Sequence, residues 1–224
     1  PSPTPSEILP PSPTPSPIPP LPPTPNPTAT ISPQSPASRL RFTTPIGGAR
    51  VPERLDLAPG ATRRYRLGIH EGVDFGFDVA GVPVSTGTRV VAAGDGVVVR
   101  ADIDYREPSL REMDEILARS RTLGYTMPAD LDRMRGMQVW IDHREGILTR
   151  YAHLNGIAAG ITVGVPVSKG QLIAYVGSSG DPEYWGGLEP HLHFEVRLGD
   201  AYLGQGLPPD QARQLYVQAL GGRD

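Results

Sequence analysis

The sequence of 224 residues contains five histidines, and four of them fall in three short motifs that also carry polar side chains. The motifs are His70-Glu71-Gly72-Val73-Asp74, Tyr151-Ala152-His153-Leu154 and His191-Leu192-His193-Phe194-Glu195. Imidazole and carboxylate groups are ligands that zinc takes in proteins, and a neutral imidazole can also accept a proton. These three motifs therefore indicate metal chemistry, acid–base chemistry, or both.

The third motif places two histidines on one side of a predicted strand. Residues i and i+2 of a strand point to the same face, so His191 and His193 project side by side, about 7 Å apart at Cα. Two imidazoles at this spacing can bind one metal ion together. They can also divide the work, with one binding the metal and the other handling protons.

The first motif brings a histidine and a carboxylate within reach of one metal ion. In a straight strand His70 and Asp74 would lie about 13 Å apart, and we expect Gly72 to let the chain turn so that they converge. A histidine, an aspartate and a second histidine make a three-ligand zinc set with an open fourth position. That layout is typical of a catalytic zinc, which lowers the pKa of a water in the open position.

Five further residues have a possible role at such a site. Glu195 shares a strand face with His193, so it either orients a histidine or is a surface carboxylate. His143, at the end of a predicted strand, is interpreted as a polar residue where the strand reaches solvent. Tyr65 either helps to hold an oxyanion or packs. Tyr184 and Trp185, in the glycine-rich stretch before His191, either wall a groove or pack.

Short β-branched segments separated by glycine turns predict a mainly β domain, mostly antiparallel. The turn signals include Asn155-Gly156 and Lys169-Gly170. The predicted strands cover Val90–Val91, Val97–Val99, Met137–Ile141, Ile161–Val167, Gln171–Val176 and His191–Leu198.

A helical insertion at about residues 104–136 interrupts this β pattern. Ser109 and Glu112 form an S-x-x-E capping box, and a second short helix is predicted to begin near Pro128. The predicted apolar faces carry Leu110, Met113, Ile116 and Leu117 in the first helix and Leu131 and Met134 in the second. Because the insertion joins two strands, we expect it to emerge at one end of the sheet.

The N-terminal stretch differs in composition from the rest of the chain. Sixteen of the 27 prolines precede Ala37, mixed with Ser and Thr. Proline fixes φ and removes a backbone donor, so residues 1–38 are predicted to be a disordered Pro/Ser/Thr-rich linker before a domain at residues 39–224. Because the chain begins at Pro1, we expect a signal peptide or a membrane anchor upstream of it.

Composition excludes several kinds of site. The sequence has no cysteine, which rules out disulfides, thiolate metal ligands and a cysteine nucleophile. The formal net charge is -3 and no basic run is present, so we expect no nucleic-acid partner. No apolar run approaches the length needed to span a membrane.

The ordered series of motifs resembles the lysostaphin-type zinc endopeptidases, also called LytM-domain or M23-family peptidases. The resemblance covers about His70 to Arg197 and is interrupted by the helical insertion. The matching segments are His70–Phe75, Ala93–Val98, Thr149–Leu154, Gly170–Ile173 and Pro190–Glu195.

This resemblance implies a fold, a site and a substrate. The fold would be a small antiparallel β-sheet core with a groove walled by loops. Because the groove walls of this family are loops at such ends of the sheet, the helical insertion would border the groove and narrow substrate choice. His70, Asp74 and His193 would bind zinc (Zn2+), and His153 and His191 would sit beside the metal-activated water. The chain would then be a monomeric zinc-dependent endopeptidase that hydrolyses peptide bonds of bacterial peptidoglycan, acting outside the cell or in the cell envelope.

Two other interpretations were weighed. Some domains that resemble this family lose metal ligands and act as non-catalytic modules that bind the wall or activate other wall hydrolases. In this sequence all five positions are filled, which favours the enzyme. A cupin-type metal site also uses an H-x-H pair, but there the pair is followed by a carboxylate and a later histidine, whereas here the pair comes last.

Overall fold

The computed structural model describes residues 40–180 and 189–221, all of which belong to one unit of the chain. Its strands are β1 (Thr62–Arg63), β2 (Gly68–Ile69), β3 (Val73–Gly76), β4 (Arg89–Val91), β5 (Gly96–Ala101), β6 (Val139–Asp142), β7 (Ile147–Ala152), β8 (Leu154–Ile157), β9 (Pro166–Val167), β10 (Leu172–Val176), β11 (His191–Leu198) and β12 (Ala201–Tyr202). Its helices are α1 (Leu110–Leu123), α2 (Pro128–Met134) and α3 (Pro209–Ala219), with short 3-10 turns η2 (Leu55–Leu57) and η3 (Arg64–Arg66). The predicted linker at residues 1–38 lies outside the described residues.

The strands form three antiparallel sheets. The largest has seven strands in the order β12-β11-β7-β6-β5-β9, with β3 paired to β11 as well, and a second has the order β4-β10-β8. β1 and β2 form a separate hairpin. Every pair of strands among the described residues is antiparallel, so the predicted fold class is confirmed.

One continuous hydrophobic core joins the two larger sheets. It contains Ile173 and Val176 of β10 together with Ile141, Tyr151 and Phe194 of the seven-stranded sheet, all of them fully buried. Fully burying a side chain of this size stabilises a fold by about 1.5–3 kcal/mol. The central strands that carry the site are therefore held rigidly.

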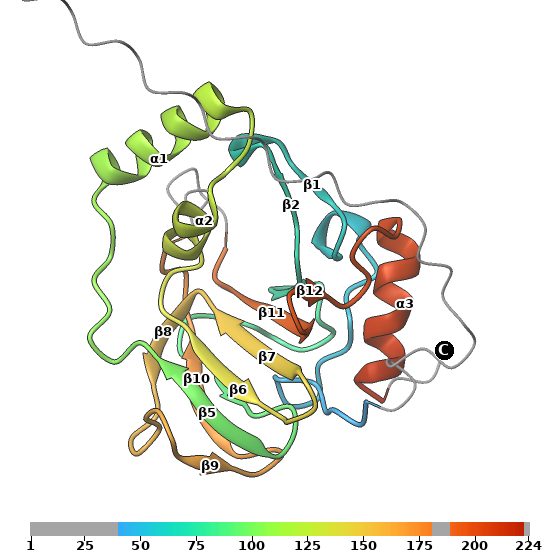
Figure 1. Cartoon of the computed structure of the whole chain (residues 1–224). Coiled ribbons are helices and arrows are strands. Elements are labelled where there is room, and N and C mark those ends of the chain that lie inside the picture. Colours follow the sequence, from blue (N-terminus) through green and yellow to red (C-terminus); the bar gives the residue numbers. More distant parts are fainter. Residues whose placement is uncertain (1–39, 181–188, 222–224) are drawn as a thin grey trace, which may run out of the picture. The chain divides into compact units, whose positions relative to one another are not determined.

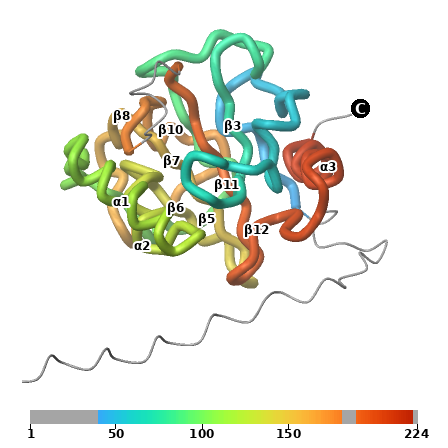
Figure 2. The backbone as a smooth tube through the Cα atoms, turned by 90° about the horizontal axis from the view of Figure 1, so that it is seen from above, coloured from blue at the N-terminus to red at the C-terminus, as the bar shows by residue number. Residues whose placement is uncertain are grey.

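The helical insertion joins β5 to β6, two neighbouring strands of the large sheet. The predicted capping box is present: Ser109 Oγ accepts from the backbone N–H of Glu112, and the Glu112 carboxylate accepts from the backbone N–H of Ser109 at 2.7 Å. The second predicted helix begins at Pro128. Figure 1 shows α1 and α2 beyond one end of the sheet, and Figure 2 shows them on the opposite side of the domain from α3.

The sheet register explains at which end of the sheet the insertion emerges. Ala101, the last residue of β5, pairs with Val139, and Val139 pairs with Tyr151. Tyr151 in turn pairs with Phe194, the neighbour of His193. An insertion between β5 and β6 therefore leaves the sheet at the end where the H-x-H pair lies.

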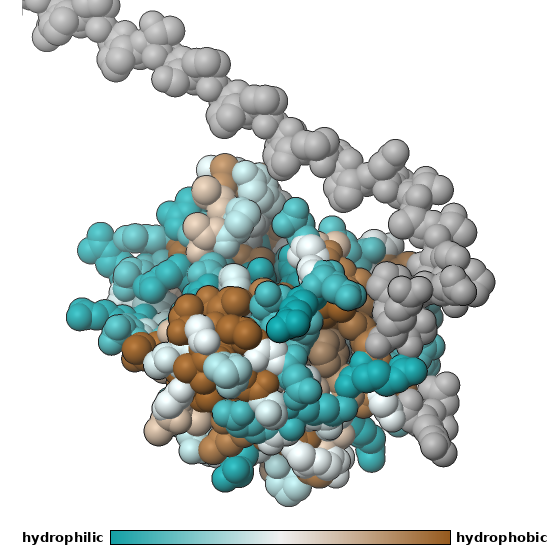
Figure 3. Space-filling view, turned by 60° about the horizontal axis from the view of Figure 1, so that its bottom comes forward, coloured by the Kyte–Doolittle hydropathy of each residue, from teal (hydrophilic) through white to brown (hydrophobic). Residues whose placement is uncertain are grey.

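The opposite end of the sheet carries β9 and an apolar surface. Val97 of β5 pairs there with Pro166, and Val97, Val99 and Val163 are exposed. Figure 3, which turns the bottom of the Figure 1 view forward, shows hydrophobic side chains gathered among hydrophilic ones. By register, Val97 and β9 lie at the end of the sheet away from His191 and His193.

Parts of the secondary structure differ from the prediction. The segment predicted as a strand over Ile161–Val167 forms only the short β9, because Thr162 to Val165 make a turn. Neither β7 and β8 nor α3 was predicted. Tyr216 of α3 lies in the core, where its hydroxyl accepts a hydrogen bond from the backbone N–H of Val196 at 2.9 Å.

Candidate metal centre

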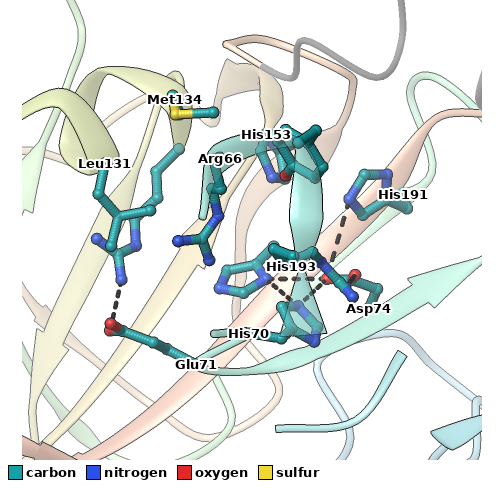
Figure 4. A pocket seen from close by; sticks show the side chains of 12 residues that line it. Arg66, His70, Glu71, Asp74, Leu131, Met134, His153, His191 and His193 are labelled. Carbon is teal, nitrogen blue, oxygen red and sulfur yellow. Dashed lines mark hydrogen bonds and ion pairs between the residues drawn. The ribbon is translucent and has the colours of Figure 1, made fainter. Parts of the chain in front are cut away.

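All five predicted site residues line one small pocket of about 40 Å³. Figure 4 shows three of them, His70, Asp74 and His193, converging on its floor, with His153 and His191 above them. They come from β3, from β11 and from the segments beside β3 and β7. Residues 123 positions apart, His70 and His193, are thus brought within hydrogen-bonding distance.

Asp74 and His193 are neighbours across a strand pair. β3 and β11 are antiparallel with Asp74 opposite His193, and His193 lies opposite Ala152 of β7. Gly72 permits the close approach just before β3, because a Cβ at this position would lie 2.9 Å from Cε1 of His193. The chain bends at Gly72, as the sequence suggested, but φ there is not positive, so it is the space left by the missing side chain that requires glycine.

Three atoms that can bind a metal face one another at the centre of the pocket. Nε2 of His70 lies 2.9 Å from Oδ1 of Asp74, Nδ1 of His193 lies 2.8 Å from the same oxygen, and the two nitrogens are 2.9 Å apart. All three residues are buried. They form a group of His and Asp residues whose ligand atoms could hold one ion.

The outer nitrogens of both imidazoles already have acceptors. Nδ1 of His70 donates to the backbone carbonyl of Ala58 at 3.0 Å, and Nε2 of His193 faces Oε1 of Glu195 at 3.1 Å. In the neutral tautomers that these partners favour, both facing nitrogens carry lone pairs. Once no proton lies between His193 and Asp74, two lone pairs and a carboxylate oxygen converge, a donor set that fits a zinc ion.

The titration behaviour of the three residues agrees with a cation site. Burial lowers the pKa of His70 to about 4, so this imidazole is neutral at pH 7. Burial opposes the charge on Asp74, yet the neighbouring His70 and His191 hold its pKa well below its usual range. Burial also opposes a charge on His193, but its hydrogen bonds to Asp74 and Glu195 raise its pKa. A metal ion would take the place of the proton that His193 shares with Asp74.

The second oxygen of Asp74 is held by an arginine that was not predicted from the sequence. Nη2 of Arg63, on β1, lies 2.8 Å from Oδ2, and both side chains are nearly buried. Oδ1 is thereby left to face the two histidines. Such a partner fixes the orientation of a ligating carboxylate.

The two remaining histidines sit beside this group. His153 has φ of 58°, a left-handed conformation that breaks the chain between β7 and β8. Its Nδ1 lies 2.8 Å from the carbonyl oxygen of Ser179, to which it can donate, so Nε2 is left as the proton acceptor. The ring of His191 lies 4.8 Å from that of His153, and its Nε2 is 3.9 Å from Oδ1 of Asp74.

A buried charge network lies behind His193. Glu195 is fully buried, so the possibility that it is a surface carboxylate is wrong, and its contact with His193 matches the orienting role. Burial works against the charge of Glu195, but the arginines around it, Arg135 above all, keep its pKa far below the usual range. The partners of its two oxygens are Arg135 at 2.7 Å, Arg197 at 3.2 Å and Arg150 at 3.4 Å.

Arg135 connects this network to the helical insertion. It caps the C-terminus of α2, and its guanidinium bridges Glu195 and Glu71, each at 2.7 Å. Its backbone carbonyl accepts from the N–H of His153 at 2.9 Å. The next residue, Gly136, has φ of +67° and packs so closely against Ser179 that a Cβ would collide with it. The end of the insertion thus contacts the groups that hold both His153 and His193.

The insertion also forms part of the pocket wall. Leu131 and Met134 of α2 line the pocket, as does Tyr65. Met113, Ile116 and Met134 form a small buried cluster against which Tyr65 packs. The predicted apolar faces are therefore buried in part, against each other and against Tyr65 of η3. The prediction was wrong for Leu110, which lies in the first turn of α1 and is 61% exposed. The expectation that the insertion borders the groove agrees with this position.

The other residues singled out in the sequence lie elsewhere or are outside the described part. His143 is half-buried and structural: Nδ1 lies 2.7 Å from the carbonyl oxygen of Asp95, and Nε2 lies 2.8 Å from the Thr149 hydroxyl. Tyr184 and Trp185 lie outside the described residues. No helix among the residues that the structure describes is long and apolar enough to cross a membrane.

The comparison with protein families agrees with the motifs. Residues 115–205 match the model of peptidase family M23, a stretch that includes His153, His191 and His193 but begins after His70 and Asp74. A curated relative, the L-Ala–D-Glu endopeptidase of Bacillus subtilis (strain 168), is 42% identical over 65 residues. The aligned part covers 28% of this chain and only 20% of that protein. The predicted resemblance to the family is confirmed.

Solved structures of the same kind were also found. A zinc-containing peptidase from Vibrio cholerae has 25% identity and a TM-score of 0.46, over 73% of this chain and 39% of that one. The catalytic domain of the prophage-encoded M23 protein EnpA from Enterococcus faecalis has 22% identity and a TM-score of 0.45, over 75% and 95%. The catalytic domain of lysostaphin from Staphylococcus simulans has 22% identity and a TM-score of 0.39, over 62% and 75%.

Proposed function

We propose that this chain, which resembles peptidase family M23, is a zinc-dependent endopeptidase that hydrolyses peptide bonds in bacterial peptidoglycan. The observation that carries the proposal is the convergence of His70, Asp74 and His193 at the floor of a pocket, with His153 and His191 beside them. The family match supports a peptidase, and the curated relative suggests a wall peptide as substrate.

The proposed zinc ligands are Nε2 of His70, Oδ1 of Asp74 and Nδ1 of His193. A zinc ion held there would lower the pKa of a water molecule and polarise the scissile carbonyl. Arg63 and Glu195 support the ligands from outside, by hydrogen bonds to Asp74 and His193 respectively.

Proton transfer is assigned to His153 and His191. The hydrogen bond from Nδ1 of His153 to Ser179 leaves Nε2 to take the proton of the attacking water and later pass it to the leaving amine. His191 is half-buried, as His153 is, and its Nδ1 lies 3.3 Å from the backbone carbonyl oxygen of Glu189. We assign it the stabilisation of the developing oxyanion, to which it would donate a hydrogen bond when it is protonated.

The setting of the enzyme follows from its substrate. We propose that the domain at residues 39–224 acts outside the cell or in the envelope, with residues 1–38 as the linker that carries it.

The decisive experiment is digestion of purified peptidoglycan by the zinc-loaded protein, with mass analysis of the fragments. New amino and carboxyl termini within the peptides are expected. Intact peptides, from protein shown to contain zinc, would instead support the non-catalytic wall-binding alternative.

A further inference from the structure

Arg66 places a buried positive charge at the same pocket, and neither the zinc site nor proton transfer uses it. The residue is only 6% exposed and lines the pocket together with the histidines. Figure 4 shows its guanidinium directed toward the floor, on the side of Glu71 and His193. One of its nitrogens, Nη2, donates to the backbone carbonyl of Ile69 at 2.6 Å.

Among the described residues, no carboxylate lies within ion-pair distance of Arg66. The nearest acidic group, Glu71, is already engaged: its Oε2 accepts from Arg135 at 2.7 Å and from Arg197 at 2.6 Å. Burial lowers the pKa of Arg66, but an arginine still keeps its charge at neutral pH. The hydrogen-bond partners of Arg66 are the backbone carbonyl of Ile69 and the side chain of Tyr65, and neither is a carboxylate. A buried charge that no opposite charge balances costs several kcal/mol, so a role for it is to be expected.

The charges nearby increase the excess of positive charge. The network behind His193 contains three arginines and two glutamates, a formal sum of +1. Arg66 raises this sum to +2 on the same side of the pocket. An excess of positive charge at a partly buried pocket favours an anionic group of a ligand.

The chain around Arg66 holds the guanidinium in place before any ligand arrives. The backbone carbonyl of Arg66 accepts a hydrogen bond from the Thr126 hydroxyl, in the loop between α1 and α2. Leu67 then turns the chain in a left-handed conformation. A Cβ at Gly68 would lie 3.2 Å from the Cζ of Arg66, so only glycine leaves room for the side chain. A binding group that is fixed in advance loses less entropy when the ligand binds.

We infer that Arg66 forms a subsite for a carboxylate of the peptide substrate, close to the bond that is cut. A guanidinium can bind a carboxylate through two parallel hydrogen bonds, which gives geometric selectivity as well as affinity. Because the pocket also holds the proposed zinc ligands, the carboxylate belongs to a residue next to the scissile bond. This inference rests on the proposed function, and it adds a preference for acidic over amidated peptides.

Binding of two matched peptides tests the inference without relying on catalysis. Both contain an L-alanyl–D-glutamyl bond and differ only in whether the other glutamyl carboxylate is free or amidated. The zinc-loaded full chain with His153→Ala, which suppresses turnover, is titrated with each peptide by calorimetry. The free carboxylate should bind about 10- to 100-fold more tightly, as expected for hydrogen bonds to a charged group.

Variants of Arg66 then test whether this residue causes the preference for the acidic peptide. Adding Arg66→Gln should weaken the acidic peptide about 10- to 100-fold and the amidated one by less than about threefold, with unchanged zinc content. Arg66→Lys should recover part of the affinity, because it keeps the charge without the planar fork. The control is Arg121→Gln, which changes an exposed arginine of α1 and should alter neither Kd.

The outcomes separate this inference from the proposed function. Equal affinity for the two peptides, absence of binding by either, or an equal loss for both in Arg66→Gln would overturn the carboxylate subsite, whether or not wild-type protein cuts peptidoglycan. A preference for the acidic peptide that disappears in Arg66→Gln would support the subsite even if digestion produced no fragments. That last result would count against the peptidase and not against Arg66.

Discussion

Replacing Arg135 by methionine should both destabilise the domain and weaken its hold on zinc. The Arg135 side chain is only 8% exposed, and its guanidinium bridges Glu195 and Glu71. Methionine fills a similar volume but makes no ion pair. Glu195 then keeps only its ion pairs with Arg197 at 3.2 Å and Arg150 at 3.4 Å. Breaking a buried ion pair costs about 3–5 kcal/mol of folding stability. Because two arginines still pair with Glu195, we expect a loss at the lower end of this range, about 3 kcal/mol.

The loss can be measured as a change in Tm and in zinc affinity. For a domain of this size about 1 kcal/mol corresponds to roughly 2–4 °C, so the Tm should fall by roughly 6–12 °C. Because Glu195 orients His193, the zinc Kd measured by chelator competition should rise about 10- to 100-fold. The control is Arg111→Met, which removes an exposed pair with Glu115 worth about 0.3–0.5 kcal/mol. A Tm and a zinc Kd as little changed as in this control would refute the proposed link.

Three further predictions concern the proposed roles of residues. Alanine at any one of the three proposed zinc ligands should abolish stoichiometric zinc, as measured by elemental analysis, and with it peptide cleavage. His153→Ala and His191→Ala should keep zinc but lose about 10²- to 10⁴-fold in kcat; loss of zinc in either, with retention in His193→Ala, would reverse the assignment. Deleting residues 1–37 should leave Tm and cleavage of soluble fragments nearly unchanged, and a marked fall in Tm would show that this segment packs on the domain.

Local patterns in the sequence predicted the elements whose signals are themselves local. The capping box of Ser109 and Glu112 fixed the start of α1, and alternation over His191–Leu198 fixed β11. The turn predicted at Asn155-Gly156 is wrong, because strand β8 runs through both residues. The chain turns instead at His153, between β7 and β8. α3 was missed because its burial depends on tertiary packing of Tyr216 against Phe194. Helical propensity alone did not predict this helix.

The candidate ligands could be predicted, whereas the groups that support them could not. His191 and His193 lie two residues apart, and His70 and Asp74 four apart, so strand geometry relates each pair directly. Arg135 acts on Glu195 from 60 positions away. In a sequence, an arginine at the end of an amphipathic helix is interpreted as a solvated residue that complements the helix dipole. Only the sheet register shows that this helix ends beside His153.

That register has a consequence for how the domain can vary. Ala101 of β5 pairs with Val139 of β6, and Val139 pairs with Tyr151 of β7. The same row across the sheet continues to Phe194 of β11. Any segment inserted between β5 and β6 must therefore emerge next to His193. In this chain the inserted helices supply the pocket wall, the Arg135 bridge and the hydroxyl that holds the Arg66 turn. An insertion at this one position can change substrate choice and zinc affinity together while leaving all five histidine and aspartate positions of the site untouched.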